Sequence, residues 1–278
     1  MSRNNQIIEF LNNAGCGGCQ IRPLAGDASN RKYWRLTLPD GRPAVLMDAP
    51  SESGEDIRPF LNIGQHLTNC GLAAPETYAQ DPTHGFILMQ DFGDGLFFDL
   101  VKSDPTQEFA LYSAALDALD HLHACAAPTN VTDYGVDAMS TAAGLAAQWY
   151  GETVDQNVLP QATHDALSKL DWSSRVLVLR DYHAQNLIWC PDQHGLARVG
   201  LLDFQDAQVG HPLYDAASLL NDARRDVAPD VKSALKSRLR AQFTNFDSVF
   251  STISAQRNLR ILGVFARLCI RDGKVGYV

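Results

Sequence analysis

Two carboxylates and one amide stand at fixed intervals in a stretch of this 278-residue chain that runs from Arg175 to Asp215. The stretch opens with Val176-Leu177-Val178-Leu179, an apolar run with the length of a buried strand. Asp181 comes next, Asn186 follows five residues later, and Asp203 ends a second strand-like pattern. Because a turn rich in Pro, Asp and Gly separates two strand patterns, we expect a hairpin that brings Asn186 beside Asp203.

Two oxygen ligands on a hairpin, with a further carboxylate nearby, suit phosphoryl transfer that depends on Mg²⁺. This ion binds one or two protein oxygens together with substrate phosphates, while the remaining carboxylate, Asp181, accepts the proton of an attacking hydroxyl. Protein kinases use the same order of groups, ending in an Asp before a Phe. Asp203-Phe204 fits that order, although Gln205 stands where protein kinases have Gly. The alternative interpretation is a hairpin with ordinary surface carboxylates.

Several stretches resemble the aminoglycoside-phosphotransferase-like kinases, and the likeness extends over nearly the whole chain. They are RDYHAQNL (180–187), GLLDFQDAQVGHPLYDAASLLNDARRDV (200–227), GDASNRKYWRL (26–36), AVLMDAP (44–50) and QRNLRILGVFARLCIRDGK (256–274). These stretches are most similar to a bacterial branch of the family that phosphorylates the anomeric hydroxyl of N-acetylmuramate and N-acetylglucosamine in cell-wall recycling. The resemblance implies ATP and Mg²⁺ as cofactors and a small sugar as the acceptor.

The resemblance also implies an α+β, bilobal protein-kinase-like fold. A small N-terminal lobe with an antiparallel β-sheet is expected at residues 1–95, and a larger, mainly helical lobe at 96–278. Strand patterns in the first lobe fall at residues 21–24, 31–38, 43–48 and 85–90. We expect Glu55 to open a helix after the third strand, where an acidic residue suits the helix dipole.

Candidate nucleotide contacts come from the first lobe. Gly26, Ala28 and Ser29 form a small-residue turn whose backbone N–H groups can approach an anion closely. In the related kinases this turn covers the nucleotide phosphates. The resemblance places Gln90 and Phe92 at the hinge, where backbone groups bind the adenine edge.

The third strand departs from the kinase pattern. Kinases carry a lysine there that binds the phosphates, whereas alignment of AVLM puts Met47 in its place. Another cation is then needed, and Lys32, Arg35 and Arg58 are the candidates. Lys32 and Arg35 leave opposite faces of one strand. We predict Lys32, because it lies nearer the glycine turn.

Candidate residues for binding the acceptor lie around the Asp181 loop and after Asp203. Asp206 is a candidate substrate contact, as an acidic residue is near this point in aminoglycoside-type relatives. Arg224 or Arg225 could meet a sugar carboxylate such as the muramyl lactyl group, the alternative being a solvated helix end. By the resemblance, Asp215 accepts hydrogen bonds from the backbone of the loop at 180–183 and His183 supports the same loop.

Composition and charge narrow the possible partners and the location of the protein. The net charge is −9 and no basic cluster is evident, which argues against nucleic acid and anionic membranes as partners. No apolar run approaches the roughly 18 residues of a membrane span, and MSRNNQIIEFLNN does not read as a secretory signal. Six irregularly spaced cysteines indicate reduced thiols and a cytoplasmic location. We interpret Cys16-Gly-Gly-Cys19 as a turn, with a metal or redox role as the alternative.

Three functions remain open. The first is a sugar kinase, and the second an aminoglycoside or other small-alcohol phosphotransferase, which an acidic surface would favour because such substrates are cationic. The third is a nucleotide-binding pseudokinase, which Met47 favours and the intact set of Asp181, Asn186 and Asp203 argues against.

Overall fold

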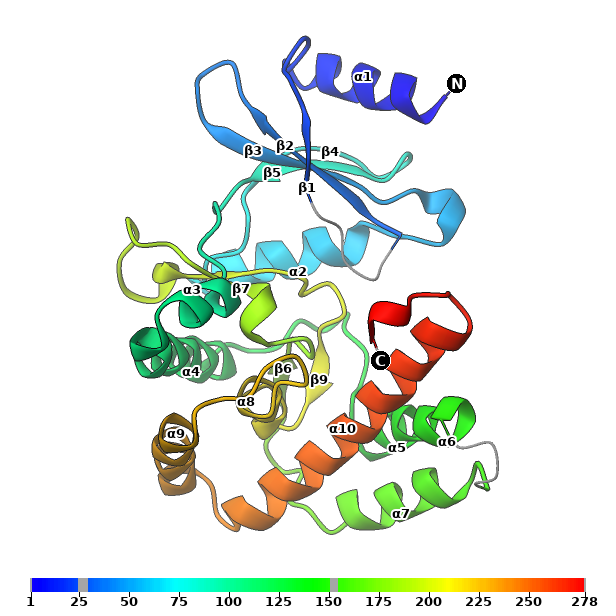
Figure 1. Cartoon of the computed structure of the whole chain (residues 1–278), viewed down its shortest axis with the longest axis vertical. Coiled ribbons are helices and arrows are strands. Elements are labelled where there is room, and N and C mark those ends of the chain that lie inside the picture. The colour runs from blue at the N-terminus through cyan, green and yellow to red at the C-terminus, as the bar shows by residue number, and fades with distance from the viewer. Residues whose placement is uncertain (1, 25–29, 151–154, 278) are drawn as a thin grey trace. The chain divides into compact units, whose positions relative to one another are not determined.

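The computed structural model describes residues 2–24, 30–150 and 155–277 and has an α+β architecture, shown in Figure 1. Its contacts divide the chain into two compact units. The first unit combines Met1–Leu96 with Leu187–Asp206, and the second combines Phe97–Asn186 with Ala207–Val278. An antiparallel sheet dominates the first unit and helices dominate the second, which confirms the predicted fold class. None of the helices in the described ranges combines the length and apolar character that a membrane span requires.

The sheet of the first unit has, within the described residues, five strands in the order β1-β2-β3-β5-β4, each antiparallel to its neighbours. Their bounds are Arg22–Leu24 for β1, Lys32–Thr37 for β2, Pro43–Asp48 for β3, Thr77–Asp81 for β4 and Phe86–Gln90 for β5. The prediction found all of these except β4, which lies at an edge of the sheet and carries the mostly polar sequence TYAQD. Edge strands lack the apolar signal of central ones because one side faces solvent.

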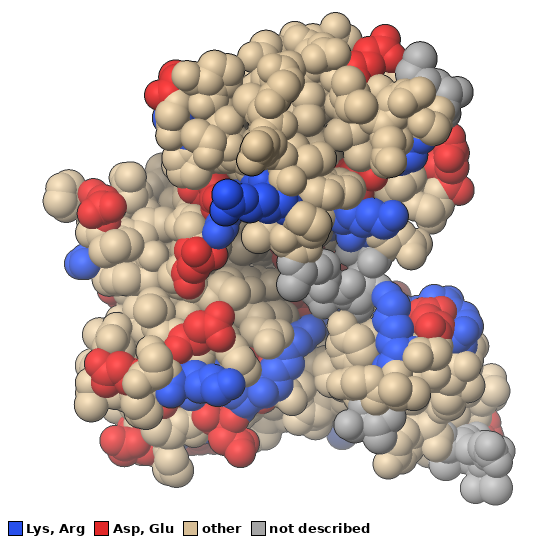
Figure 2. Space-filling model, turned by 45° about the horizontal axis from the view of Figure 1, so that its top comes forward, with Lys and Arg blue, Asp and Glu red and all other residues tan. Residues whose placement is uncertain are grey.

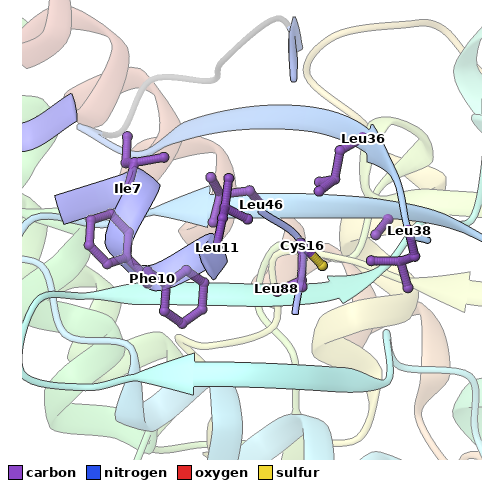
Figure 3. Close-up of a cluster of buried hydrophobic side chains, with 10 residues drawn as sticks. Ile7, Phe10, Leu11, Cys16, Leu36, Leu38, Leu46 and Leu88 are labelled. Atoms are coloured by element: carbon purple, nitrogen blue, oxygen red, sulfur yellow. The ribbon is translucent and has the colours of Figure 1, made fainter. Parts of the chain in front are cut away.

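Helix α1 (Arg3–Asn13) covers one side of this sheet, and α2 (Arg58–Asn69) lies on the other side (Figure 1). Figure 3 shows the apolar face of α1 directed at the strands, where Phe10 stacks on Phe86 at 5.4 Å between ring centroids. Ser2 caps the helix by accepting a hydrogen bond from the backbone N–H of Asn5. Burial of this face fixes α1 on the sheet.

A small hairpin also belongs to the first unit. It pairs β7 (Leu187–Trp189) with β8 (Val199–Leu201) in antiparallel register. Backbone hydrogen bonds join it to the rest of the unit, from Trp189 N–H to the Gly95 carbonyl at 2.7 Å and from Leu201 N–H to the Ala73 carbonyl at 2.8 Å. The hairpin was predicted, but its first strand begins at Leu187 and not at the preceding residue.

Phe204 attaches the chain after β8 to helix α2. Its fully buried ring stacks on Phe60 at 4.7 Å between centroids. A side chain at Gly64 would lie only 3.3 Å from the same ring, so glycine permits this close contact. The residue before Phe204 is Asp203, whose backbone is therefore anchored by a packed aromatic ring.

The second unit is built around the long helix α10 (Phe246–Ile270), which packs on α5 (Val136–Ala143), α6 (Leu145–Tyr150) and α8 (Leu213–Leu220), as Figure 1 shows. A side chain at Gly263 would lie 2.3 Å from the Leu145 backbone, so this glycine sets the distance between α10 and α6. The remaining helices and strands of the unit are α3 (Phe97–Ser103), α4 (Glu108–Ala124), α7 (Val158–Leu167), α9 (Pro229–Gln242), β6 (Val176–Val178) and β9 (Gln208–Gly210). β6 pairs with β9, a strand that was not predicted.

Candidate active site

The loop that carries Asp181 is held by a buried carboxylate from α8. Asp215 is fully buried and accepts hydrogen bonds from the backbone N–H groups of Leu179, at 2.6 Å, and Arg180, at 2.9 Å. The predicted contact to the loop backbone is therefore present, at its first residues. Burial raises the pKa of Asp215 to about 7, although the two hydrogen bonds act in the opposite direction.

Arg180 adopts a left-handed backbone conformation just before Asp181, with φ of 70°. Among the described residues other than glycine, only Arg180, Asp203 and Asn245 have positive φ. Residues of this kind are uncommon because the side chain crowds the backbone. Two of the three lie at or beside predicted site residues, and such outliers cluster at functional sites.

Asp181 forms an ion pair with Arg260 of α10, at 3.4 Å between Oδ1 and Nη1. Burial raises the pKa of the Asp181 carboxyl, but Arg260 and Arg180 outweigh it and hold that pKa below its usual value. The carboxylate is therefore ionised at neutral pH, which makes it a hydrogen-bond acceptor only. Its side chain remains 28% exposed, so a ligand hydroxyl could reach it.

Asn186 is oriented by the same loop. Its amide nitrogen donates to the Asp181 backbone carbonyl at 2.9 Å and lies 3.3 Å from Nε2 of His183. Because the amide nitrogen is hydrogen-bonded to the loop, Oδ1 is the side-chain atom of Asn186 that can ligate a cation. The residue closes a short 3-10 turn, Ala184–Asn186, directly before β7.

His183 accepts a hydrogen bond from Arg224. The distance from Nη1 of Arg224 to Nε2 of His183 is 3.0 Å, and a guanidinium has only donors, so Nε2 must be unprotonated. Burial, followed by the charge of Arg224, lowers the pKa of His183 to about 3. The imidazole is neutral at physiological pH and supports the position of its neighbours.

Arg225, the alternative candidate for a sugar carboxylate, lies elsewhere in the second unit. Its guanidinium pairs with the buried carboxylate of Glu108 and donates to the Tyr112 hydroxyl at 2.7 Å. These contacts join it to α4. Arg224 is therefore the member of the pair that lies beside the Asp181 loop.

Asp203 follows β8 and belongs to the first unit. Its backbone is left-handed, with φ of 54°, and Nε2 of Gln205 donates to its Oδ1 at 2.8 Å. Nη1 of Arg31 lies 3.6 Å from the same oxygen. Nε of Arg31 in turn donates to Glu55 at 2.9 Å. We call Arg31, Glu55 and Asp203 the Arg31 cluster.

Glu55 does not open α2 as predicted. The helix begins at Arg58, and Glu55 lies in the preceding segment, where its carboxylate reaches Arg31. The sequence signal that could have found this pair was Arg31 itself, one residue before the predicted Lys32.

The other predicted nucleotide contacts are placed as follows. Gly26, Ala28 and Ser29 lie outside the described residues. Lys32 is exposed on β2, opposite Asp48 in the strand pairing. Met47 is buried at 1% exposure, so a lysine at this position would bring a charge into the core.

The predicted hinge residues occupy different environments. The Gln90 backbone N–H donates to the Glu76 carbonyl at 2.8 Å, so its contact to an adenine would have to come from another group. The Phe92 ring lies against Gly200 of β8, where a side chain would be 2.8 Å from the ring. Asp206, the acidic candidate for the acceptor, is exposed.

The donor set fits a Mg²⁺ ion that is held together with substrate phosphates. No group of three or more His, Cys, Asp or Glu side chains that could hold a metal occurs in the described part of the chain. Mg²⁺ in phosphotransferase sites needs only one or two protein oxygens besides phosphate and water. The Asp203 carboxylate, two residues after β8, and the Asn186 amide oxygen, directly before β7, are atoms of this kind.

A family model described as a phosphotransferase enzyme family, APH, matches residues 20–247. The N-acetylmuramate/N-acetylglucosamine kinase of Caulobacter vibrioides is 33% identical, over 96% of this chain and 86% of the relative. The chain therefore belongs to the APH phosphotransferase family and is a member of a family of kinases.

Solved structures agree with this fold. Choline kinase LicA from Streptococcus pneumoniae has a TM-score of 0.70 at 13% identity, over 98% of this chain and 92% of that chain. An aminoglycoside phosphotransferase from Streptomyces rimosus, in complex with ADP and streptomycin, has a TM-score of 0.59 at 15% identity. The likeness covers 92% of this chain and 99% of that structure.

Proposed function

We propose that the protein is an ATP- and Mg²⁺-dependent kinase that phosphorylates a hydroxyl of an amino sugar. The acceptor is N-acetylmuramate or N-acetylglucosamine, and the reacting group is the anomeric hydroxyl. The observation that carries the reaction type is the loop in which Asp181 is held ionised by Arg260 and braced by Asp215. The substrate class is supported by relatives that share about a third of their residues with this chain.

Asp181 has the role of orienting the sugar hydroxyl and accepting its proton. A carboxylate with a lowered pKa is a weak base, so proton transfer occurs late, when the hydroxyl has begun to bond to phosphorus. Asp215 and His183 contribute by fixing the loop. Most of the rate then comes from positioning and charge neutralisation, since phosphoryl transfer leaves little covalent chemistry for the protein.

Asn186 and Asp203 are the proposed protein ligands of Mg²⁺. The ion neutralises phosphate charge and orients the triphosphate when it is bound. The left-handed backbone at Asp203 and the hydrogen bond from Gln205 fix the direction of this carboxylate. ATP is the donor used by the family, and we propose Gly26, Ala28, Ser29, Gln90 and Phe92 as its contacts by backbone or ring.

Arg224 and Asp206 are the proposed acceptor contacts. N-Acetylmuramate carries a lactyl carboxylate that N-acetylglucosamine lacks, and an arginine is suited to bind it. Arg224 already has a guanidinium group beside the Asp181 loop, through its contact with His183. We place the reaction in the cytoplasm, where ATP is available, and in the recycling of cell-wall sugars.

A substrate panel tests this function. The purified chain is incubated with ATP, Mg²⁺ and each of N-acetylmuramate, N-acetylglucosamine, choline and several aminoglycosides, and ADP release is measured. We expect turnover with the two amino sugars and a product whose phosphorus couples to the anomeric proton in NMR. Turnover of aminoglycosides alone would establish the alternative phosphotransferase that the acidic composition favours. ATP binding without any turnover would indicate a pseudokinase.

A further inference from the structure

The described chain lacks the strand lysine of protein kinases, so a different group must meet the negative charge of a nucleotide. Met47 occupies that position on β3 and is buried. A triphosphate carries several negative charges, and one Mg²⁺ compensates only part of them. A second cation near Asp203 is therefore required if Asp203 binds the metal.

Arg31 has the position and contacts of such a cation. Its guanidinium lies 3.6 Å from the Asp203 carboxylate, a distance of an ion pair without a hydrogen bond. The side chain is only 13% exposed, which limits the orientations it can adopt. A planar guanidinium presents five donors, so it can bind Glu55 along one edge and phosphate oxygens along another.

Glu55 fixes this arrangement. It accepts the Nε hydrogen of Arg31 at 2.9 Å and is itself 16% exposed. In protein kinases a glutamate pairs with the strand lysine in the same manner. In this chain the corresponding pair is formed by Arg31, directly before β2, and Glu55, in the segment before α2. Asp203 keeps the position of the kinase carboxylate that binds the metal.

The other two arginines that the sequence offered as candidates have acidic partners of their own. Arg35 pairs with Asp91 and Asp94, and Arg58 pairs with Asp56 at the surface, where the Arg58 side chain is 73% exposed. Figure 2 shows many basic side chains lying beside acidic ones on the face that it presents.

The charge of the cluster makes the arrangement depend on the metal. One guanidinium and two carboxylates give the three side chains a net charge of −1, which repels free nucleotide. With one Mg²⁺ bound, the same three side chains and the ion carry +1. The Arg31–Asp203 contact is long enough for the guanidinium to turn toward a phosphate once the carboxylate binds the ion.

We propose that Arg31, held by Glu55, is the side chain that binds the nucleotide phosphates in place of the missing strand lysine. The proposal rests on the proposed function, because it assumes that the chain binds ATP with Mg²⁺. It replaces our sequence-based choice of Lys32, the next residue, which is exposed at the first position of β2.

The test measures binding and not turnover. The full chain is titrated with a non-hydrolysable ATP analogue and, separately, with adenosine, each with Mg²⁺, in a calorimeter. Loss of charged hydrogen bonds to phosphate should raise the Kd of Arg31→Ala for the analogue by about 10- to 100-fold. The Kd for adenosine should stay within about twofold, because adenosine has no phosphates.

Five further variants complete the design. Arg31→Lys retains a positive charge and should recover part of the affinity. It serves as the charged comparison if Arg31→Ala fails to fold. Glu55→Gln should raise the Kd for the analogue by a smaller factor, and the double variant should show less than the product of both effects. Arg42→Ala, at an exposed ion pair with Asp40, is the matched control and should bind both ligands normally. Lys32→Ala should likewise change the Kd less than threefold.

Three outcomes would overturn the inference. One is an unchanged analogue Kd in Arg31→Ala while the wild type binds, which leaves the proposed function intact. Another is a larger loss in Lys32→Ala, which would restore our first choice. A wild type that binds neither the analogue nor adenosine would overturn both this inference and the proposed function.

Discussion

The Arg31 cluster of the first unit differs in charge from the cluster around Asp181 in the second. We call Asp181, His183, Arg224 and Arg260 the Asp181 cluster. Two arginines and one carboxylate, with a neutral histidine, give it a net charge of +1. The Arg31 cluster has the reverse composition, with two carboxylates and one arginine.

This difference separates two tasks of a phosphotransferase. A cluster with excess carboxylate is suited to bind a metal ion, and a cluster with excess arginine keeps its carboxylate ionised and favours an anionic group. The contacts that hold the two clusters also differ. The backbone beside Asp181 is hydrogen-bonded to the fully buried Asp215, whereas the Arg31–Asp203 contact, at 3.6 Å, is an ion pair without a hydrogen bond. We expect the Arg31 cluster to rearrange on ligand binding and the Asp181 cluster to remain fixed.

The largest expected effect comes from removing Asp203, the proposed metal-binding carboxylate. Asp203→Ala should lower kcat by at least about 10³-fold, because the triphosphate would lose its metal and its alignment. Circular dichroism should show a folded protein, since Asp203 is partly exposed. Asp192→Ala, an exposed carboxylate on the loop of the same hairpin, is the control. Near-normal turnover of Asp203→Ala would end the metal assignment.

Replacing the proposed base has the next largest effect. Asp181→Asn should lower kcat by about 10²-fold or more, the scale of a lost general base, while the Kd for the ATP analogue changes little. Steady-state kinetics and calorimetry on the same sample measure both. A variant that loses nucleotide affinity as well would contradict the separation of tasks between the clusters.

Arg260 should affect the pH dependence of the reaction. Arg260 lowers the pKa of Asp181, so Arg260→Met should raise that pKa. Because the ionised carboxylate is the active form, kcat/KM is lost as the pH falls through this pKa. The acid limb of the profile should therefore move to higher pH than in the wild type. Arg271→Met, at an exposed ion pair beyond α10, is the control and should leave the profile unchanged.

The smallest effect concerns the choice of acceptor. Arg224→Gln should raise the KM for N-acetylmuramate about five- to tenfold and leave the KM for N-acetylglucosamine almost unchanged, because a rim ion pair is worth about 1 kcal/mol. The two sugars serve as controls for each other, since a disturbed His183 would affect both. Equal changes in both KM values would assign Arg224 to support of the loop alone.

The sequence predicts the candidate residues that follow from spacing along the chain. Asp181, Asn186 and Asp203 were singled out because two carboxylates around an amide, the second directly before Phe, form a specific order. The missing lysine at Met47 was recognised for the same reason. Asp215 was predicted to hold the loop, and the structure has its carboxylate on the backbone of Leu179 and Arg180.

The missed residues act through contacts that spacing does not encode. Arg260 is 79 residues away from Asp181 in the chain and meets it only because α10 passes the loop. Arg31 was assigned only as the first residue of the strand predicted at 31–38 and was not weighed as a cation, whereas β2 begins after it. Glu55 was predicted to begin a helix because acidic residues favour helix N-termini. In the structure it instead accepts a hydrogen bond from Arg31, 24 residues away.

The left-handed backbone at Arg180 and Asp203 has a consequence for the evolution and engineering of this enzyme. Each such residue costs on the order of 1 kcal/mol that glycine or asparagine would largely avoid. Substitution of either residue by glycine thus relieves a local cost, and at Asp203 it also removes the proposed Mg²⁺ ligand. Screens that select only for a higher melting temperature should therefore accept Asp203→Gly and yield stable proteins with poor turnover.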